Sequence, residues 1–88
     1  MNHVVLVGTL MSVKEFEGGD GIFTISVCNE DNTYIDIEVV VKNMLDNKMI
    51  RLIDIGDQIG IKAKFRKINE EAKLVAERVS FISRKKGK

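Results

Sequence analysis

The segment that decides the fold is Met1-Asn2-His3-Val4-Val5-Leu6-Val7-Gly8-Thr9-Leu10. Its β-branched and aliphatic residues at positions 4–10 predict a strand. Gly8 falls inside this strand, where a residue without a Cβ permits a sharp bend. We therefore expect the first strand to bend at Gly8, as the strands of a small closed β-structure must.

Period-two alternation of apolar and polar residues predicts four further strands. They cover residues 22–28, 35–41, 59–65 and 74–82. Residues 17–21 include Gly18, Gly19 and Gly21 and predict a turn, because glycine adopts positive φ without a steric penalty. The chain of 88 residues thus offers five short strands, enough for one domain with a single small core.

Between the third and fourth strands the apolar period changes to that of a helix. Leu45, Met49, Leu52 and Ile53 recur at helical spacing, and Gly56 follows as a helix terminator. The predicted order is therefore β-β-β-α-β-β. This is the order of the OB fold, an all-β five-stranded barrel with one short helix, here over residues 1–83. A split sheet covered by one helix has the same order, but short strands without protected edges favour the closed barrel.

Several segments resemble bacterial single-stranded DNA-binding proteins, in the same order along the chain. The first ten residues are similar to the first strand of that family, Ile25-Ser26-Val27-Cys28-Asn29-Glu30 to its second, and Val39-Val40-Val41-Lys42-Asn43 to its third. Gly56-Asp57-Gln58-Ile59 resembles the start of its fourth strand, and residues 76–82 resemble its fifth. The likeness covers nearly the whole sequence.

The resemblance implies an OB barrel that binds single-stranded DNA without sequence specificity in replication, recombination or repair. It also implies a homo-oligomer, a dimer or tetramer, that assembles partly through the first strand. Members of the family often end in an acidic tip that recruits partner proteins, whereas this sequence ends in basic residues and resembles a short form without that tip. Replication or recombination proteins are therefore expected partners only in general terms.

Two departures from the family pattern concern the predicted binding face. Lys42 stands where the family has a Trp or Phe, which removes a stacking platform worth about 1–3 kcal/mol per base. Asp36 and Glu38 fall on the same strand face and repel phosphate. These departures motivate an alternative function, an OB-fold protein-interaction subunit of a primosome-like or phage replication complex. RNA is an alternative ligand to DNA, since nothing in the sequence tests for the sugar.

Cationic residues are segregated along the sequence, which indicates a polyanion site better than the net charge of +1 does. Lys62, Lys64 and Arg66 fall on one face of the fourth strand with no acid between them, and Lys67 follows directly. With Lys42, they are expected to track a phosphate backbone. The alternative is an ordinary solvated strand face, on which lysine blocks edge pairing.

The last five residues and the aromatic residues complete the set of candidates. Residues 84–88 form a basic tail, in which Arg84, Lys85 and Lys86 are further candidate nucleic-acid contacts. Tyr34 offers either one stacking surface for a base or a rim position with a solvated hydroxyl. Three aromatic side chains share the apolar face of their strands and are expected in the core: Phe23, Phe65 and Phe81.

The sequence carries no pattern typical of an enzyme, a metal site or a membrane protein. His3 and Cys28 are the only residues of their kinds, so neither a disulfide framework nor a structural zinc site is expected. Without a nucleophile motif or a phosphate-cradling glycine loop, we expect a non-enzymatic protein with no cofactor. No apolar run approaches 20 residues and no signal-peptide pattern is present, so we expect a cytoplasmic location.

Overall fold

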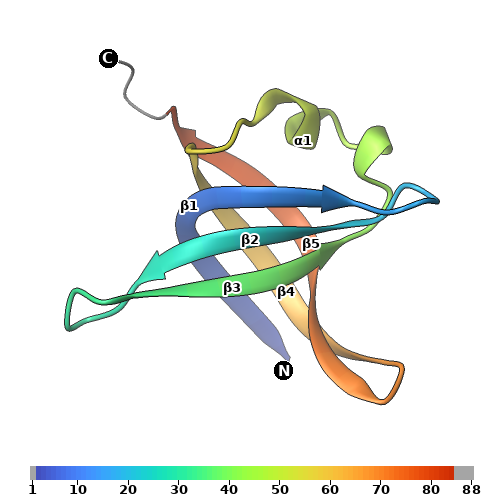
Figure 1. The fold of residues 1–88 in the computed structure, drawn as a ribbon, viewed down its shortest axis with the longest axis horizontal. Helices are drawn as coiled ribbons and strands as arrows, with labels where there is room; N and C mark the ends of the chain where they lie inside the picture. Colours follow the sequence, from blue (N-terminus) through green and yellow to red (C-terminus); the bar gives the residue numbers. More distant parts are fainter. Residues whose placement is uncertain (1, 85–88) are drawn as a thin grey trace.

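The computed structural model describes residues 2–84 and confirms a closed five-stranded barrel with one short helix, the OB fold (Figure 1). The elements are β1 (His3–Glu15), β2 (Gly21–Cys28), β3 (Tyr34–Val41), the 3-10 turn η1 (Met44–Asp46), α1 (Lys48–Leu52), β4 (Gln58–Ile68) and β5 (Glu71–Ser83). Around the barrel they are neighbours in the order β1-β2-β3-β5-β4. The predicted element order is confirmed, although β1, β4 and β5 run several residues longer than expected.

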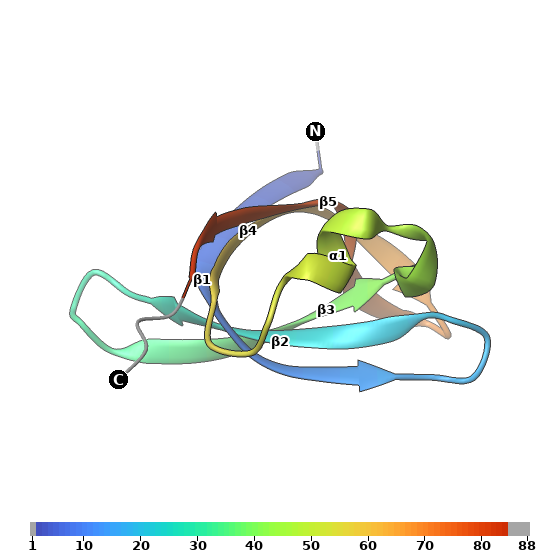
Figure 2. The same cartoon turned by 90° about the horizontal axis from the view of Figure 1, so that it is seen from above.

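The first strand serves two parts of the barrel. Residues 3–9 of β1 pair with β4, and residues 9–15 pair with β2. At the change of partner, a Cβ added to Gly8 would collide with the carbonyl oxygen of Ser26, so only glycine allows the two backbones to approach this closely. A register shift between Leu10 and Ser12 follows, and Figure 2 shows the curvature of β1 that results. The bend expected at Gly8 therefore has a definite cause.

Alternate residues of the strands fill the barrel interior. Eight apolar side chains are no more than 2% exposed: Leu10, Phe23, Ile25, Val39, Val41, Ile59, Ile61 and Ala63. Phe23 thus lies in the core as expected, but the prediction is wrong for Phe65 and Phe81, which are 48% and 39% exposed. Among the described residues, the strand pairing of β4 with β1 ends at Lys64, so the ring of Phe65 lies beyond the closed part of the barrel. Phe81 lies near the opposite end, beside Arg84.

The helix is shorter than predicted and presents a different face to the barrel. Asn47 begins α1 by accepting hydrogen bonds from the backbone N–H groups of Met49 and Ile50, at 2.9 and 3.4 Å. The preceding 3-10 turn shifts the helical phase, so Ile50 is buried, whereas Met49 and Leu52 are 36% and 65% exposed. The predicted apolar stripe is therefore wrong at Met49 and Leu52 and correct at Ile53, and the side chain of Leu45 lies outside the described part.

The glycine expected to end the helix has another role. Gly56 has φ of 100°, but α1 ends at Leu52, so Gly56 shapes the turn into β4 instead. Its N–H donates to the carbonyl oxygen of Leu10, and the N–H of Leu10 donates to the carbonyl of Asp57. The turn is thus tied to the middle of β1. Among residues 2–84 no helix is long and apolar enough to cross a membrane.

A buried carboxylate lies where this turn meets the end of β5. The side chain of Asp57 is 0% exposed. Its Oδ2 accepts from the backbone N–H of Asp54 at 2.8 Å and lies 2.9 Å from Nη1 of Arg84. The same guanidinium nitrogen lies 3.1 Å from the Asp54 carboxylate, and the guanidinium stacks 5.0 Å from the centre of the Phe81 ring. Arg84 therefore pins the end of β5 to the start of β4.

Replacing Arg84 by alanine is expected to lower the free energy of unfolding by about 2–3 kcal/mol, because the buried Asp57 carboxylate loses its guanidinium partner. Urea unfolding followed by circular dichroism measures the change. Arg51→Ala removes the same charge from the exposed surface of α1 and serves as the control. Equal stabilities of the two variants would contradict a structural role for Arg84.

Candidate nucleic-acid interface

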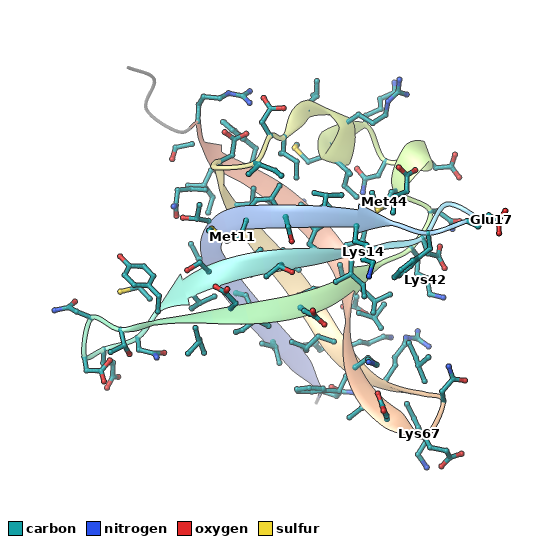
Figure 3. The ribbon with its side chains drawn as sticks, in the orientation of Figure 1. Met11, Lys14, Glu17, Lys42, Met44 and Lys67 are labelled. Atoms are coloured by element: carbon teal, nitrogen blue, oxygen red, sulfur yellow. The ribbon has the colours of Figure 1, made fainter. Side chains whose placement is uncertain are left out.

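Four of the predicted cations lie around one groove on the β4–β5 hairpin. Its lining residues are Lys42, Lys64, Arg66, Lys67, Ile68, Val75, Ala76 and Glu77. Lys64 and Arg66 alternate along β4, and Lys42 joins them because β3 ends against β5, where Val40 pairs with Val75. The groove volume of about 580 Å³ is within the range of known ligand sites. Figure 3 shows Lys42 at the end of β3 and Lys67 near the hairpin tip.

Acidic side chains from neighbouring elements pair with several of these cations. Lys64 Nζ lies 3.2 Å from one carboxylate oxygen of Glu77, and Nδ1 of His3 lies 3.2 Å from the other. Lys42 Nζ lies 3.4 Å from the Asp20 carboxylate. No acid lies between Lys62, Lys64 and Arg66 along β4, as expected. The neighbouring strand β5, however, places the Glu77 carboxylate beside Lys64, so the face is not free of acids. The groove is basic and partly neutralised.

The unpaired cation in the groove is Arg66. Lys67 has a loose partner, Glu70, at 3.7 Å, and both side chains are largely exposed. Within residues 2–84, no carboxylate lies within ion-pair distance of Arg66. Its guanidinium presents planar paired N–H donors, which suit a phosphate. Arg66 is therefore the cation in the groove that is readiest to receive an anion.

Hydrogen bonding keeps the acids at the groove ionised. The Lys64 ammonium, which donates to the carboxylate, holds the pKa of Glu77 below its usual range. The backbone N–H of Asn43 lowers the pKa of Asp20, helped by the Lys42 ammonium. Both carboxylates therefore carry their charge at neutral pH and compete with any anion for Lys64 and Lys42.

The remaining predicted cations lie elsewhere. Lys62 is exposed on the outer face of β4, between Val5 of β1 and Arg78 of β5, and does not line the groove. Arg84 is held by Asp54 and Asp57, whereas the β4–β5 hairpin extends from the other end of β4 (Figure 1). Lys85 and Lys86 lie outside the described residues. The structure thus does not bring Lys62 or Arg84 into the groove.

Tyr34 lies far from the groove along β3. Its side chain is 67% exposed and shares the outer face of the β2–β3 pair with Asp36 and Glu38. Tyr34 is six positions from Val40 along β3, which is roughly 20 Å of extended strand. A polyanion that reached both Tyr34 and the groove would have to pass both acids.

A second hollow, which the sequence did not indicate, lies on the other side of the Val40–Val75 pair. It is lined by Ile22, Glu38, Val40, Phe65, Ala72, Lys73 and Leu74. Lys14 of β1 stands opposite Ile22, one of the residues that line this hollow. The register shift between Leu10 and Ser12 reverses the faces of β1 before Lys14, and the three-residue spacing of the apolar Leu10 and Val13 is its signal in the sequence. Among residues 2–84 there is no cluster of metal-ligating side chains.

Comparisons with known proteins agree with the barrel. No family model matches the chain, and no curated protein is a significant match in sequence. Among solved structures, the dimeric N-terminal domain of PriB from Thermoanaerobacter tencongensis matches with a TM-score of 0.67 and 18% identity, over 92% of this chain and 96% of that one. The mitochondrial single-stranded DNA-binding protein Rim1 of S. cerevisiae matches with a TM-score of 0.74 and 16% identity, over 93% and 94%. A chain of the replication protein A heterotrimer bound to ssDNA matches with a TM-score of 0.64 and 12% identity, over 93% and 58%.

The protein is an OB-fold protein. Its structural neighbours include proteins described as single-stranded DNA-binding, and the resemblance seen in the sequence therefore extends to the fold. Identities below 20% establish the shared fold and leave the ligand of this chain to its own residues.

The contact between Glu77 and Lys64 gives a testable pKa. Lys64→Ala removes the hydrogen bond that lowers the pKa of Glu77, so that pKa should rise toward the ordinary glutamate value. Carboxyl ¹³C NMR over a pH titration measures it. Lys62→Ala, which removes a weaker and more distant charge, should change the Glu77 pKa less. Equal effects of the two variants would contradict the pairing.

Proposed function

We propose that this protein binds single-stranded DNA, largely independently of sequence, during replication, recombination or repair. The observation that carries the proposal is the convergence of Lys42, Lys64, Arg66 and Lys67 on one groove of an OB barrel. Cations gathered along one groove suit the phosphates of a single strand, and the face of β2 and β3 with its flanking loops is the usual binding surface of the fold. The proteins described above as binding ssDNA share this barrel.

Binding to phosphates releases counterions, so affinity should fall steeply with salt. For a single strand, log K falls with log salt with a slope of about −0.7 per phosphate contact, which gives roughly −3 for four contacts. Fluorescence anisotropy of a labelled 12-nucleotide strand at several salt concentrations measures this slope. An RNA strand of the same sequence, added as a competitor, tests the choice of sugar.

The double variant Lys64→Ala, Arg66→Ala should weaken binding about tenfold at low salt for all sequences and reduce the slope by about 1.4. Lys48→Ala, Arg51→Ala removes the same charge from α1, where neither side chain pairs with an acid in the described chain, and is the matched control. If the two double variants lose the same affinity, binding depends on net charge and the groove is not the site.

An apolar patch supports assembly of the protein into a homo-oligomer. Val5, Val7 and Ile82 are 70%, 52% and 50% exposed on the outer face of β1, β4 and β5. Val7 stands opposite Gly60, and the Ile82 methyl lies where it would contact a Cβ on Gly60. Exposed apolar side chains gathered around a glycine offer a flat surface for a second copy, and the PriB domain that shares the fold is described as dimeric.

The double variant Val5→Asp, Val7→Asp should therefore be monomeric, while the native chain should have at least twice its monomer mass of 9.9 kDa. Size-exclusion chromatography with light scattering measures both. Leu52→Asp, Ile55→Asp changes two exposed apolar residues elsewhere and is the control. A native chain that elutes as a monomer would contradict this assembly.

A second candidate function is an OB-fold subunit whose ligand is a protein of a replication complex. Asp36 and Glu38 favour it, because they oppose phosphate on the outer face of β2 and β3 and leave Tyr34 as the aromatic residue of that face. The same anisotropy titration separates the two functions. Absence of binding at low salt would exclude the DNA-binding proposal and leave the protein ligand.

A further inference from the structure

We propose that the second hollow, between the β2–β3 face and the β4–β5 hairpin, is a nucleobase slot that prefers cytosine to thymine. Glu38 is the residue that selects the base. This inference rests on the proposed binding of single-stranded DNA and adds to it a modest base preference, which the cationic groove cannot supply because every nucleotide carries the same phosphate.

The walls of the slot are apolar and come from two elements. On the sheet, Ile22 of β2 stands opposite Val40 of β3. On the hairpin, Phe65 of β4 stands opposite Leu74 of β5, and Ala72, two residues before Leu74, also lines the slot. The hollow has a volume of about 300 Å³, at the lower end of the range for small-molecule sites. A flat ligand with apolar faces suits such walls, and a phosphate does not.

The aromatic wall is the ring of Phe65, whose backbone is hydrogen-bonded to Asn2. Phe65 is 48% exposed, so its ring is available for stacking. The side-chain amide of Asn2 accepts from the backbone N–H of Phe65 at 2.8 Å and donates to its carbonyl oxygen at 2.7 Å. These bonds tie the hairpin to the start of β1 at the position where β4 leaves the barrel. The backbone that carries the stacking ring is therefore anchored to the start of β1.

The polar groups of the slot are unequal. Lys73 lies 3.1 Å from the carboxylate of Glu71, so its ammonium already has a partner. The Glu38 carboxylate makes no hydrogen bond or ion pair with another residue in the described range 2–84. An ionised carboxylate accepts hydrogen bonds and donates none. The slot therefore offers a ligand one free acceptor, and its negative charge repels phosphate.

Cytosine meets this requirement better than thymine does. Its exocyclic N4 amino group donates readily to a carboxylate, and this is a known pairing of Glu and Asp with bases. At the same position thymine has the O4 carbonyl oxygen, which faces the carboxylate with like partial charge. The remaining donor of thymine, N3–H, lies between two carbonyl oxygens. The two bases have the same ring size, so the walls do not distinguish them.

Cations next to the slot can hold the backbone of the inserted nucleotide. Lys14 stands opposite Ile22, one of the slot residues, and Lys42 follows β3 two residues after Val40. A strand can thus place a phosphate at these lysines and its base against Phe65. The slot therefore extends the cationic groove across the junction of β3 and β5 and is no separate ligand site.

The test compares the affinity of the full chain for dC12 and dT12 at pH 7.5 and low salt, by fluorescence anisotropy. The native protein should bind dC12 about 3- to 10-fold more tightly, as expected for one added hydrogen bond of ordinary net strength at an exposed site. Glu38→Gln replaces the carboxylate by an amide that both donates and accepts, so the ratio should fall to about one while binding of dT12 improves. Asp36→Asn removes the same charge two residues away, outside the slot. It should raise both affinities equally and keep the native ratio.

Each outcome separates this inference from the function beneath it. Equal native affinities for dC12 and dT12 would overturn the base preference and leave DNA binding intact. A preference that survives in Glu38→Gln, or that disappears equally in Asp36→Asn, would also overturn the role of Glu38. Absence of binding to either strand at low salt would contradict the proposed function itself, and the slot with it.

Discussion

The barrel closes where β3 meets β5 through a single parallel pair, Val40 and Val75, and the candidate interface depends on that closure. Every other neighbouring pair of strands is antiparallel and runs over many residues. β3 ends one residue later, at Val41, and the next residue, Lys42, lines the same groove as Lys64 and Arg66. The same pair separates the two hollows, since Val40 lines one and Val75 lines the other. The Val40–Val75 pair therefore both closes the barrel and sets the position of the candidate interface.

The charge of the interface is moderated by its own surroundings. Glu77 faces Lys64, Asp20 faces Lys42, and Arg66 alone is without a carboxylate partner in the part of the groove that the structure describes. A phosphate that enters the groove must replace a carboxylate at Lys42 and at Lys64. Loss of these ion pairs offsets part of the free energy that the phosphate gains from the two lysines.

The sequence predicted the parts of the fold that depend on local periodicity. Alternation along β2 and β3 identified both strands and their buried faces, and the element order identified the OB barrel. The helix was predicted in the right place, but the face predicted to be buried was wrong. A 3-10 turn precedes Asn47 and changes which residues of α1 face the barrel, and the spacing of apolar residues does not reveal that turn. Phe65 follows the alternation of the core residues, but β4 extends beyond the last residue that pairs with β1, so Phe65 lies outside the closed barrel. How far a hairpin extends beyond its barrel depends on strand pairing, which local alternation does not show.

The candidate site was predicted less completely, for a related reason. The basic face of β4 is visible in the sequence, since Lys64 and Arg66 alternate there. The partner that neutralises Lys64 is 13 positions away, and only the register of β4 with β5 brings Glu77 against it. Arg84 begins a segment whose composition is typical of a mobile tail, yet its guanidinium pairs with the buried Asp57 carboxylate. No local sequence pattern indicates this pairing. Residues that act through long-range pairing thus require the structure.

The proposed position of nucleic acid, across the junction of β3 and β5, can be tested on the full chain. Amide ¹H–¹⁵N NMR spectra recorded while a 12-nucleotide single strand is added show which residues it contacts. The largest shift changes are expected at Lys42, Phe65 and Arg66, and small changes on α1. Largest changes on α1 or around Val5 and Val7, with the hairpin unmoved, would contradict it.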